Sequence, residues 1–220
     1  KAEADAVSVS VREINKGYFC VEIKFETNSY LKMKNEIAQI VSSVLENDMN
    51  IISSVSNQPR KTLVLEPVYK FLPLCASASV KKNKNEANGD YIIKESMPDS
   101  RFLISISDGM GSGNEAAFQS KKTAEILKEL LGAKYSVSKA LKLVSTALAA
   151  GGNEVFSTLD AAIIDLFDGS AKFIKVGAMP SVIFHENDIE TVFCANMPIG
   201  ILDNVSSKVV TKKLKKDDIC

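Results

Sequence analysis

The chain has 220 residues, of which 45% are hydrophobic and 25% charged, a composition typical of globular proteins that bury a core. Lysine and arginine together number 27, as do aspartate and glutamate, so no excess charge indicates binding to nucleic acid or to a membrane surface. No apolar run approaches the length of a membrane-spanning helix. The length allows one or two domains. The first residue is lysine rather than methionine, which indicates a fragment or a processed chain.

The N-terminal residues predict a small strand-strand-helix segment. Residues 7–11 and 18–25 alternate apolar and polar side chains, which predicts two strands of a hairpin. Apolar residues then recur at helical spacing over residues 33–45, which predicts an amphipathic helix. Residues 53–61 are rich in polar side chains and are the best candidate for a linker.

The remaining sequence predicts strands, then two helices, then strands. Two apolar helical patterns cover residues 113–132 and 136–150. Strand patterns cover residues 63–65, 69–80, 91–94, 101–107, 158–167, 171–176, 181–184, 189–193 and 207–214. This order indicates an α+β fold rather than alternating strands and helices. Asp168-Gly169 lies between two of the strands, and it predicts a two-residue hairpin turn with no chemical role.

The cysteines and the histidine give no basis for a structural zinc site. Cysteines stand at positions 20, 75, 194 and 220, and none forms a Cys-x-x-Cys pair. Reduced thiols in the cytosol are the simplest interpretation. His185 lies in a polar segment typical of a surface turn, without an evident partner to orient it for catalysis.

The most informative stretch follows the apolar run 101–107. That run predicts a buried strand, and it ends in Asp108, three glycines within five positions, and a helix. A carboxylate at a strand end beside a glycine turn is well placed to hold a cation, because glycines let backbone carbonyls approach closely. A plain turn explains the same residues equally well. A nucleotide-binding loop would need Gly-Lys-Ser/Thr, whereas Asn114 and Glu115 follow Gly113.

Four segments together resemble the PPM family of metal-dependent serine/threonine phosphatases, and within it the branch that acts in bacterial sporulation. They are Asn-Gly-Asp-Tyr at 88–91, Ser-Asp-Gly-Met-Gly-Ser-Gly at 107–113, Ser-Thr-Leu-Asp at 157–160 and Phe-Ile-Lys-Val-Gly-Ala-Met-Pro-Ser at 173–181. The resemblance implies a PPM-type αββα sandwich over residues 61–220, incomplete at its C-terminus. Residues 1–60 would then be a regulatory or linker segment.

The resemblance also implies a two-metal site. Asp108 is similar to the catalytic aspartate that bridges two divalent ions, manganese or magnesium. Gly109 would offer its backbone carbonyl to one ion, and Asp90 matches an acidic position near the second ion or its waters. The family activates a metal-bound water for attack on a phosphoserine. Thr158 and Asp160 match a further motif, for which we expect structural roles.

One departure from the family concerns the end of the sequence. The family carries further metal-binding aspartates after the next apolar strand, whereas this sequence ends at Cys220, where that strand is expected to begin. The resemblance therefore implies an incomplete two-metal site, and a chain that is inactive, or nearly so, as it stands.

The resemblance implies a phosphorylated anti-anti-sigma factor as the substrate, and a cytoplasmic domain of a protein that is membrane-tethered upstream. It also allows a homodimer. Two other function classes stay open. The chain could be a non-catalytic, phosphatase-like module for regulation or assembly, or, on weaker grounds, a nucleotide-binding regulator that uses the glycine turn.

Overall fold

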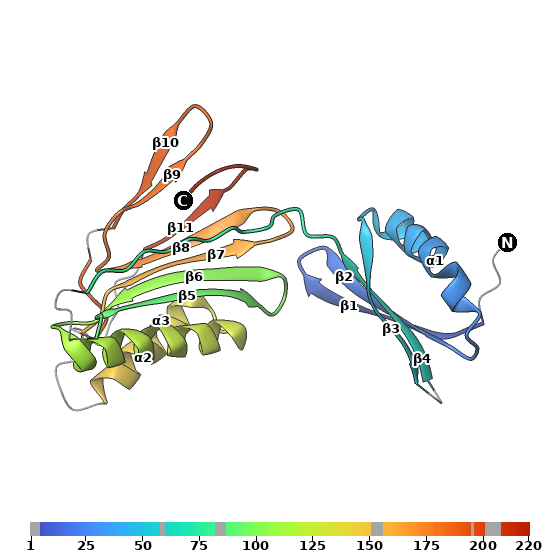
Figure 1. The fold of residues 1–220 in the computed structure, drawn as a ribbon, viewed down its shortest axis with the longest axis horizontal. Helices are drawn as coiled ribbons and strands as arrows, with labels where there is room; N and C mark the ends of the chain where they lie inside the picture. The colour runs from blue at the N-terminus through green and yellow to red at the C-terminus, as the bar shows by residue number, and fades with distance from the viewer. Residues whose placement is uncertain (1–4, 58–59, 82–86, 151–155, 195, 201–207) are drawn as a thin grey trace. The chain divides into compact units, whose positions relative to one another are not determined.

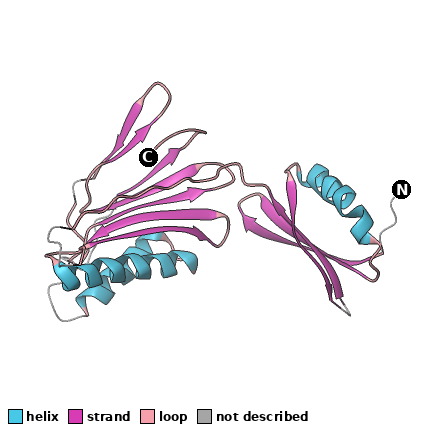
Figure 2. Ribbon diagram, in the orientation of Figure 1, coloured by secondary structure: helices cyan, strands magenta, loops and turns pink. Residues whose placement is uncertain are grey.

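The structure is a computed structural model that describes residues 5–57, 60–81, 87–150, 156–194, 196–200 and 208–220. The chain divides into two compact units, Lys1–Lys70 and Phe71–Cys220. Figure 1 labels their helices and strands, and Figure 2 separates the two kinds of element by colour.

The first unit is a four-stranded antiparallel sheet with one helix. Its elements are β1 (Ala6–Asn15), β2 (Tyr18–Phe25), α1 (Tyr30–Leu45), β3 (Met49–Asn57) and β4 (Arg60–Pro67). The strand order is β1-β2-β4-β3. The core lies between the sheet and α1, where Tyr30, Leu63 and Leu65 are fully buried and Phe25 stacks on Tyr30. The predicted hairpin and helix are confirmed.

The predicted linker over residues 53–61 is wrong. Residues 53–57 belong to β3 and residues 60–61 to β4, and Ser53 pairs with Val64 and Val55 with Thr62, while residues 58–59 lie outside the described residues. The prediction failed because β3 is an edge strand, and edge strands are often rich in polar residues.

The second unit is built on a five-stranded antiparallel sheet of order β11-β8-β7-β6-β5. Its elements are β5 (Asp90–Met97), β6 (Arg101–Asp108), α2 (Gly113–Gly132), α3 (Val137–Ala149), β7 (Leu159–Asp165), β8 (Ser170–Val176), β9 (Ser181–Phe184), β10 (Ile189–Val192) and β11 (Lys208–Lys213). Helices α2 and α3 cover one face of this sheet, as Figures 1 and 2 show. The main core lies between them and includes Leu103, Leu127, Leu141, Leu159 and Ile174, each fully buried.

A second core lies on the other face of the sheet. Phe173 packs there with Ile183 and Val192 of the β9–β10 hairpin and with Leu214. Ile219 pairs with Phe184, so a further backbone segment joins β9 on this side. The described residues of this unit thus form two helices, a five-stranded sheet and a smaller layer of strands, and the predicted α+β class is confirmed.

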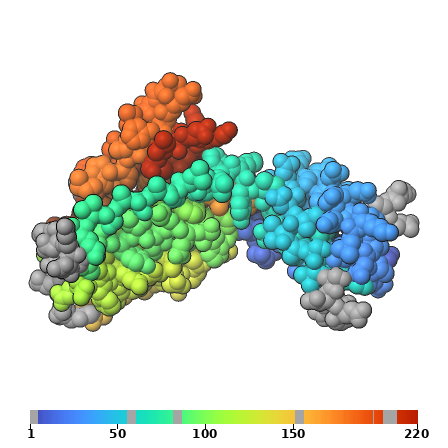
Figure 3. Space-filling view, viewed as in Figure 1, coloured from blue at the N-terminus to red at the C-terminus, as the bar shows by residue number. Residues whose placement is uncertain are grey.

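Two local predictions in this unit are wrong. Residues 69–80 form no strand, although Phe71 N–H donates to Leu166 O at 3.0 Å, and this blue-green stretch runs along the surface in Figure 3. Pro73 lacks the N–H that a ladder needs, which opposes strand pairing. The turn at Asp168-Gly169 is longer than two residues, because β7 ends at Asp165.

Candidate functional site

Strands β5 and β6 bring Asp90 and Asp108 together. Asp90 begins β5 and is the direct cross-strand partner of Asp108, which ends β6. Directly opposed residues of an antiparallel pair project to the same face, with Cβ atoms about 5 Å apart. The two carboxylates predicted to bind metal therefore lie side by side at one edge of the sheet.

Gly109 continues the line of β6 and lies against the first turn of α2. A Cβ at this position would come within 2.0 Å of the Ala116 carbonyl oxygen, so no other residue fits without moving the helix. Its N–H donates to Gly89 O at 3.2 Å, and its backbone pairs with Ser157. Gly113 has a φ of 73°, a left-handed conformation that favours glycine at the start of α2.

Two of the three predicted metal-binding residues, Asp108 and Gly109, bring oxygens to one region next to Asp90. A Cβ added to Gly89 would lie 3.6 Å from Asp108 Oδ1 and 3.6 Å from the Gly109 carbonyl oxygen. Both oxygens thus face the space above Gly89, immediately before Asp90 in the chain. Carboxylate and carbonyl oxygens are the donors that magnesium and manganese prefer. The donor set fits a hard divalent cation.

A cluster of hydroxyl groups holds the backbone of Asp108. Thr158 Oγ1 accepts from Asp108 N–H at 3.1 Å, and Ser157 Oγ donates to Asp108 O at 2.9 Å. Ser107 and Ser157 are buried and join their hydroxyls at 2.8 Å. Thr158 therefore has the structural role expected for it. No role was predicted for Ser107 or Ser157, although both lie in the motifs that carry the family resemblance.

The two carboxylates repel each other. Partial desolvation of the side chain and the nearby Asp90 carboxylate raise the pKa of Asp108 above its ordinary value of 3.8, although the residue remains exposed. Among the residues that the structure describes, no group of three or more His, Cys, Asp or Glu side chains is arranged to hold a metal ion. The described part of the site consists of two carboxylates and one carbonyl, without a third acidic ligand.

Asp160 is engaged elsewhere by a buried lysine. Lys175 Nζ lies 2.6 Å from Asp160 Oδ2 and donates to Ser181 Oγ at 2.7 Å, and the Ser181 hydroxyl donates to Asp160 at 2.9 Å. The Lys175 side chain is fully buried, and its ion pair joins β8 to β7 while the hydrogen bonds of Ser181 add β9. The position of Asp160 agrees with the structural role expected for it.

His185 has a partner that the sequence analysis did not find. Its Nδ1 lies 2.9 Å from Asp218 Oδ2, while the backbone N–H of His185 donates to Asp188 O within the expected turn. Asp218 lies 33 residues further along the chain, and the pairing depends on the backbone contact of Phe184 with Ile219. The two backbone hydrogen bonds between Phe184 and Ile219 hold the C-terminal segment against β9.

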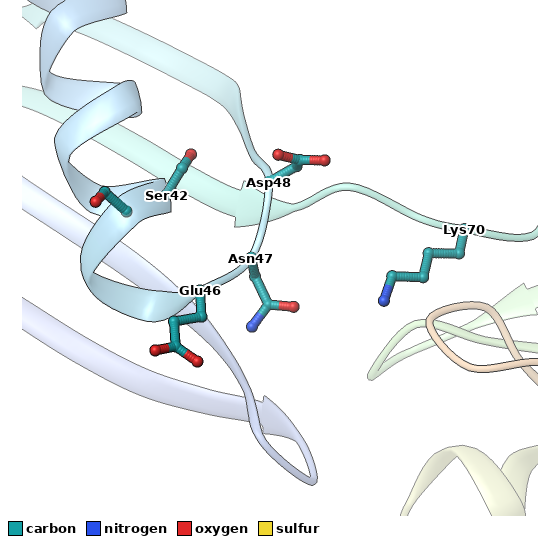
Figure 4. Close-up of a pocket in the computed structure, with 6 residues that line it drawn as sticks. Ser42, Glu46, Asn47, Asp48 and Lys70 are labelled. Atoms are coloured by element: carbon teal, nitrogen blue, oxygen red, sulfur yellow. The ribbon is translucent and has the colours of Figure 1, made fainter.

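A cavity of about 330 Å³ lies in the first unit, at the end of α1 (Figure 4). Its lining is Ser42, Ser43, Glu46, Asn47, Asp48 and Lys70. None of the predicted site residues lines this cavity. Adjacent carboxylates and a backbone carbonyl oxygen, the donors that a metal-binding centre needs, lie together at the end of the β5–β6 pair. We therefore place the candidate site there.

Replacing Asp108 by asparagine should stabilise the fold at neutral pH in the presence of a chelator. Because the folded state raises the pKa of Asp108, this carboxyl contributes stability below pH 3.8 that is lost as the pH rises through the raised value. The residue is exposed, so we expect a gain of at most about 0.5 kcal/mol at neutral pH and none in acid. Urea unfolding at both pH values measures it, and a loss of stability at neutral pH would contradict the repulsion.

Comparison with known proteins gives a consistent family. The family model of stage II sporulation protein E (SpoIIE) matches residues 98–220, more than half of the chain. Stage II sporulation protein E of Bacillus subtilis is 27% identical over 216 residues, which are 96% of this chain and 26% of that protein. The protein of the same name from Priestia megaterium is 32% identical over 143 residues, 64% of this chain and 24% of that protein. The chain spans about a quarter of the length of these curated relatives.

A solved structure extends the likeness to the fold. It contains the PP2C phosphatase domain and a fragment of the regulatory domain of SpoIIE from Bacillus subtilis, and matches with a TM-score of 0.72 at 27% identity. The match covers 96% of this chain and 62% of that one. This match to a phosphatase domain confirms the predicted PPM-type fold. The chain belongs to the stage II sporulation protein E family.

Proposed function

We propose that this chain is part of a metal-dependent protein serine/threonine phosphatase. The observation that carries the proposal is the convergence of Asp108 Oδ1 and the Gly109 carbonyl beside Asp90. The match to a PP2C phosphatase domain supports it. The sequence predicted a regulatory or linker segment over residues 1–60 and a phosphatase part over residues 61–220. In this proposal the second unit, Phe71–Cys220, supplies the catalytic part and the first unit is the regulatory segment.

Asp108, Gly109 and Asp90 would hold the metal, either manganese or magnesium, with two ions in the complete site. Bound divalent cations would supply Lewis-acid chemistry, lowering the pKa of water and neutralising phosphate charge. The chain's own residues fix the donors in place. The hydroxyls of Ser157 and Thr158 hold the Asp108 backbone, and α2 packed on Gly109 fixes the carbonyl. Such rigid placement avoids the cost of ordering ligands when a cation arrives.

The substrate in this proposal is a phosphoserine protein, an anti-anti-sigma factor in the control of sporulation. The solved Bacillus subtilis relative is described as a cell fate determinant, which agrees with a role in sporulation control. Anchoring to a membrane outside these residues is also part of the proposal. None of the described helices is both long and apolar enough to cross a bilayer.

A second candidate function is a phosphatase-like module that regulates or assembles without catalysis. The observation in its favour is the small donor set, because the described residues bring no third acidic side chain to Asp90 and Asp108. Two carboxylates are few ligands for two divalent ions that repel each other.

One assay distinguishes the catalytic function from the non-catalytic one. The test uses the longest protein encoded by the reading frame that contains these 220 residues, a phosphoserine protein substrate, and manganese, magnesium or a chelator. We expect phosphate release with a cation and none with the chelator. Binding of the substrate without release of phosphate under any of the three conditions would favour the non-catalytic module.

A further inference from the structure

Three exposed methionines lie at the end of the sheet that carries the candidate site. Met110, Met179 and Met197 are 60%, 81% and 59% exposed, while the other three of the six methionines are buried or half-buried. Exposed methionine is common where proteins bind one another, because its flexible, polarisable side chain adapts to the surface of a partner. We call these three residues the methionine surface.

Paired backbone segments bring two of these methionines close to each other. Ser157 lies between two neighbours, since it pairs with Gly109 on one side and with Ile199 on the other. Met110 directly follows Gly109, and Met197 lies two residues before Ile199. Both methionines therefore belong to segments directly beside Ser157, and in Figure 1 these segments lie at the end of the sheet where α2 begins.

The loop that carries Met179 is fixed against the same segments. A Cβ added to Gly177 would come within 2.7 Å of the Pro198 Cα atom, so this loop closely contacts the neighbouring segment. Lys175 donates to Ser181 Oγ at 2.7 Å and so joins the two ends of the loop. Because the loop is braced in this way, little backbone freedom is lost when a partner contacts Met179.

The register of the sheet sets the distance from this loop to the metal-binding residues. Thr158 N–H donates to Asp108 O at 2.9 Å, and the next residue, Leu159, pairs with Val176. Gly177 therefore lies two strand spacings, about 10 Å, from Asp108. Three residues of extended chain span about 10 Å. A protein with its phosphoserine at Asp108 thus brings the neighbouring residues of its own chain to the methionine surface.

The segments of the methionine surface are uncharged. Residues 109–114, 177–181 and 196–200 include no charged side chain, whereas Asp90 and Asp108 place two carboxylates beside them. An uncharged, apolar surface beside a metal-binding centre suits a ligand that is charged at one group and apolar around it. A phosphoserine flanked by apolar residues has this character, and a phosphoserine flanked by lysine or glutamate does not.

We propose that the methionine surface docks the phosphoserine protein that the site dephosphorylates, by packing on apolar residues that flank the phosphoserine. This docking depends on the proposed phosphatase function, and it adds the feature by which the substrate protein is chosen. The methionines contact the protein around the phosphoserine and not the reacting phosphate. Binding energy from such remote contacts lowers KM, and small phosphate esters, which lack flanking residues, do not use it.

The first test compares two substrates in the longest protein encoded by the reading frame, with manganese. Replacing Met179 and Met197 together by glutamine keeps the side-chain length and removes the apolar ends. For a serine-phosphorylated anti-anti-sigma factor we expect kcat/KM to fall at least about tenfold, mainly through KM. For p-nitrophenyl phosphate we expect kcat/KM to stay within about twofold of wild type, because this ester has no flanking residues.

Ile189→Gln is the matched control. Ile189 is 63% exposed and pairs with Phe184 at the far end of the β9–β10 hairpin from Ser181, so its replacement should affect neither substrate. Unchanged kcat/KM for the phosphoprotein in the double variant, or an equal loss with both substrates, would overturn the docking surface. A wild-type protein that hydrolyses neither substrate would refute the phosphatase function itself, and the docking with it.

The second test asks whether the methionine surface is open in the longest encoded protein and covered by the substrate. Hydrogen peroxide converts exposed methionines to sulfoxides, and mass spectrometry of peptides gives the rate at each position. With a chelator to stop turnover, we expect Met110, Met179 and Met197 to be oxidised at least about tenfold faster than the buried Met97. Saturating phosphorylated anti-anti-sigma factor should slow all three.

Two results of this oxidation experiment would overturn the proposal. Slow oxidation of the three methionines without substrate would show that another part of the protein covers them. Equal rates with and without the phosphoprotein would show that the substrate does not.

Discussion

Replacing Asp108 by alanine is expected to reduce phosphatase turnover at least about a hundredfold while the fold persists, the scale of loss seen when one preorganised electrostatic group is removed from an active site. The carboxylate lies at the end of β6, faces Asp90 and is exposed, so its removal leaves no buried cavity. Its removal takes away a ligand that two cations would share. The assay uses the longest encoded protein with manganese, and calorimetry measures the affinity for the ion.

The second Asp-Gly pair supplies the control. Asp168 Oδ1 accepts from Ser170 N–H at 2.7 Å, and Asp168 Oδ2 lies 3.0 Å from Lys213 Nζ, so its carboxylate serves the β7–β8 turn. Asp168→Ala should cost about 1 kcal/mol of stability and leave turnover per folded molecule unchanged. Near wild-type turnover in Asp108→Ala, or an equal loss in Asp168→Ala, would refute the assignment of Asp108.

Local sequence patterns predicted the elements that depend on neighbours along the chain. The three helices and the β1–β2 hairpin follow from spacing that repeats within a few residues. The same reasoning failed for two segments whose composition does not match their structure. Polar residues of β3 were predicted as a linker, and alternation over residues 69–80 was predicted as a strand although Pro73 opposes pairing.

The candidate site was predicted through motifs and not through periodicity. The spacing of apolar residues placed Asp108 at a strand end, but only the family resemblance singled out Asp90 as its neighbour. Their adjacency depends on the β5–β6 register, which a local pattern does not specify. The hydroxyl of Ser157 reaches Asp108 from 49 residues away, a distance over which no helical or strand period carries information.

Lys175 is another residue whose role depends on distant partners. Periodicity placed it inside an apolar strand, where a charged side chain is unexpected. The structure explains the buried charge, because the ammonium group forms an ion pair with Asp160 and donates a hydrogen bond to Ser181. The three residues come from β7, β8 and β9, and the hydrogen bonds of Ser181 to the ion pair join the hairpin to the main sheet.

Replacing Asp160 by alanine should therefore lower the free energy of unfolding by about 3 kcal/mol or more. The Lys175 ammonium would stay fully buried without its carboxylate, and an uncompensated buried charge is costly. Lys175→Met should cost less, about 1–2 kcal/mol, because methionine fills the apolar path and the remaining Asp160 is 25% exposed and keeps the Ser181 hydroxyl.

The double variant Asp160→Ala with Lys175→Met tests the pairing directly. Its cost should be clearly smaller than the sum of the two single costs, because neither change then leaves a buried charge alone. Urea unfolding followed by circular dichroism gives all three values. Additive costs, or a cost below about 1 kcal/mol for Asp160→Ala, would mean that the ammonium finds water or another partner, and that the Lys175–Asp160 pair does not hold the hairpin on the sheet.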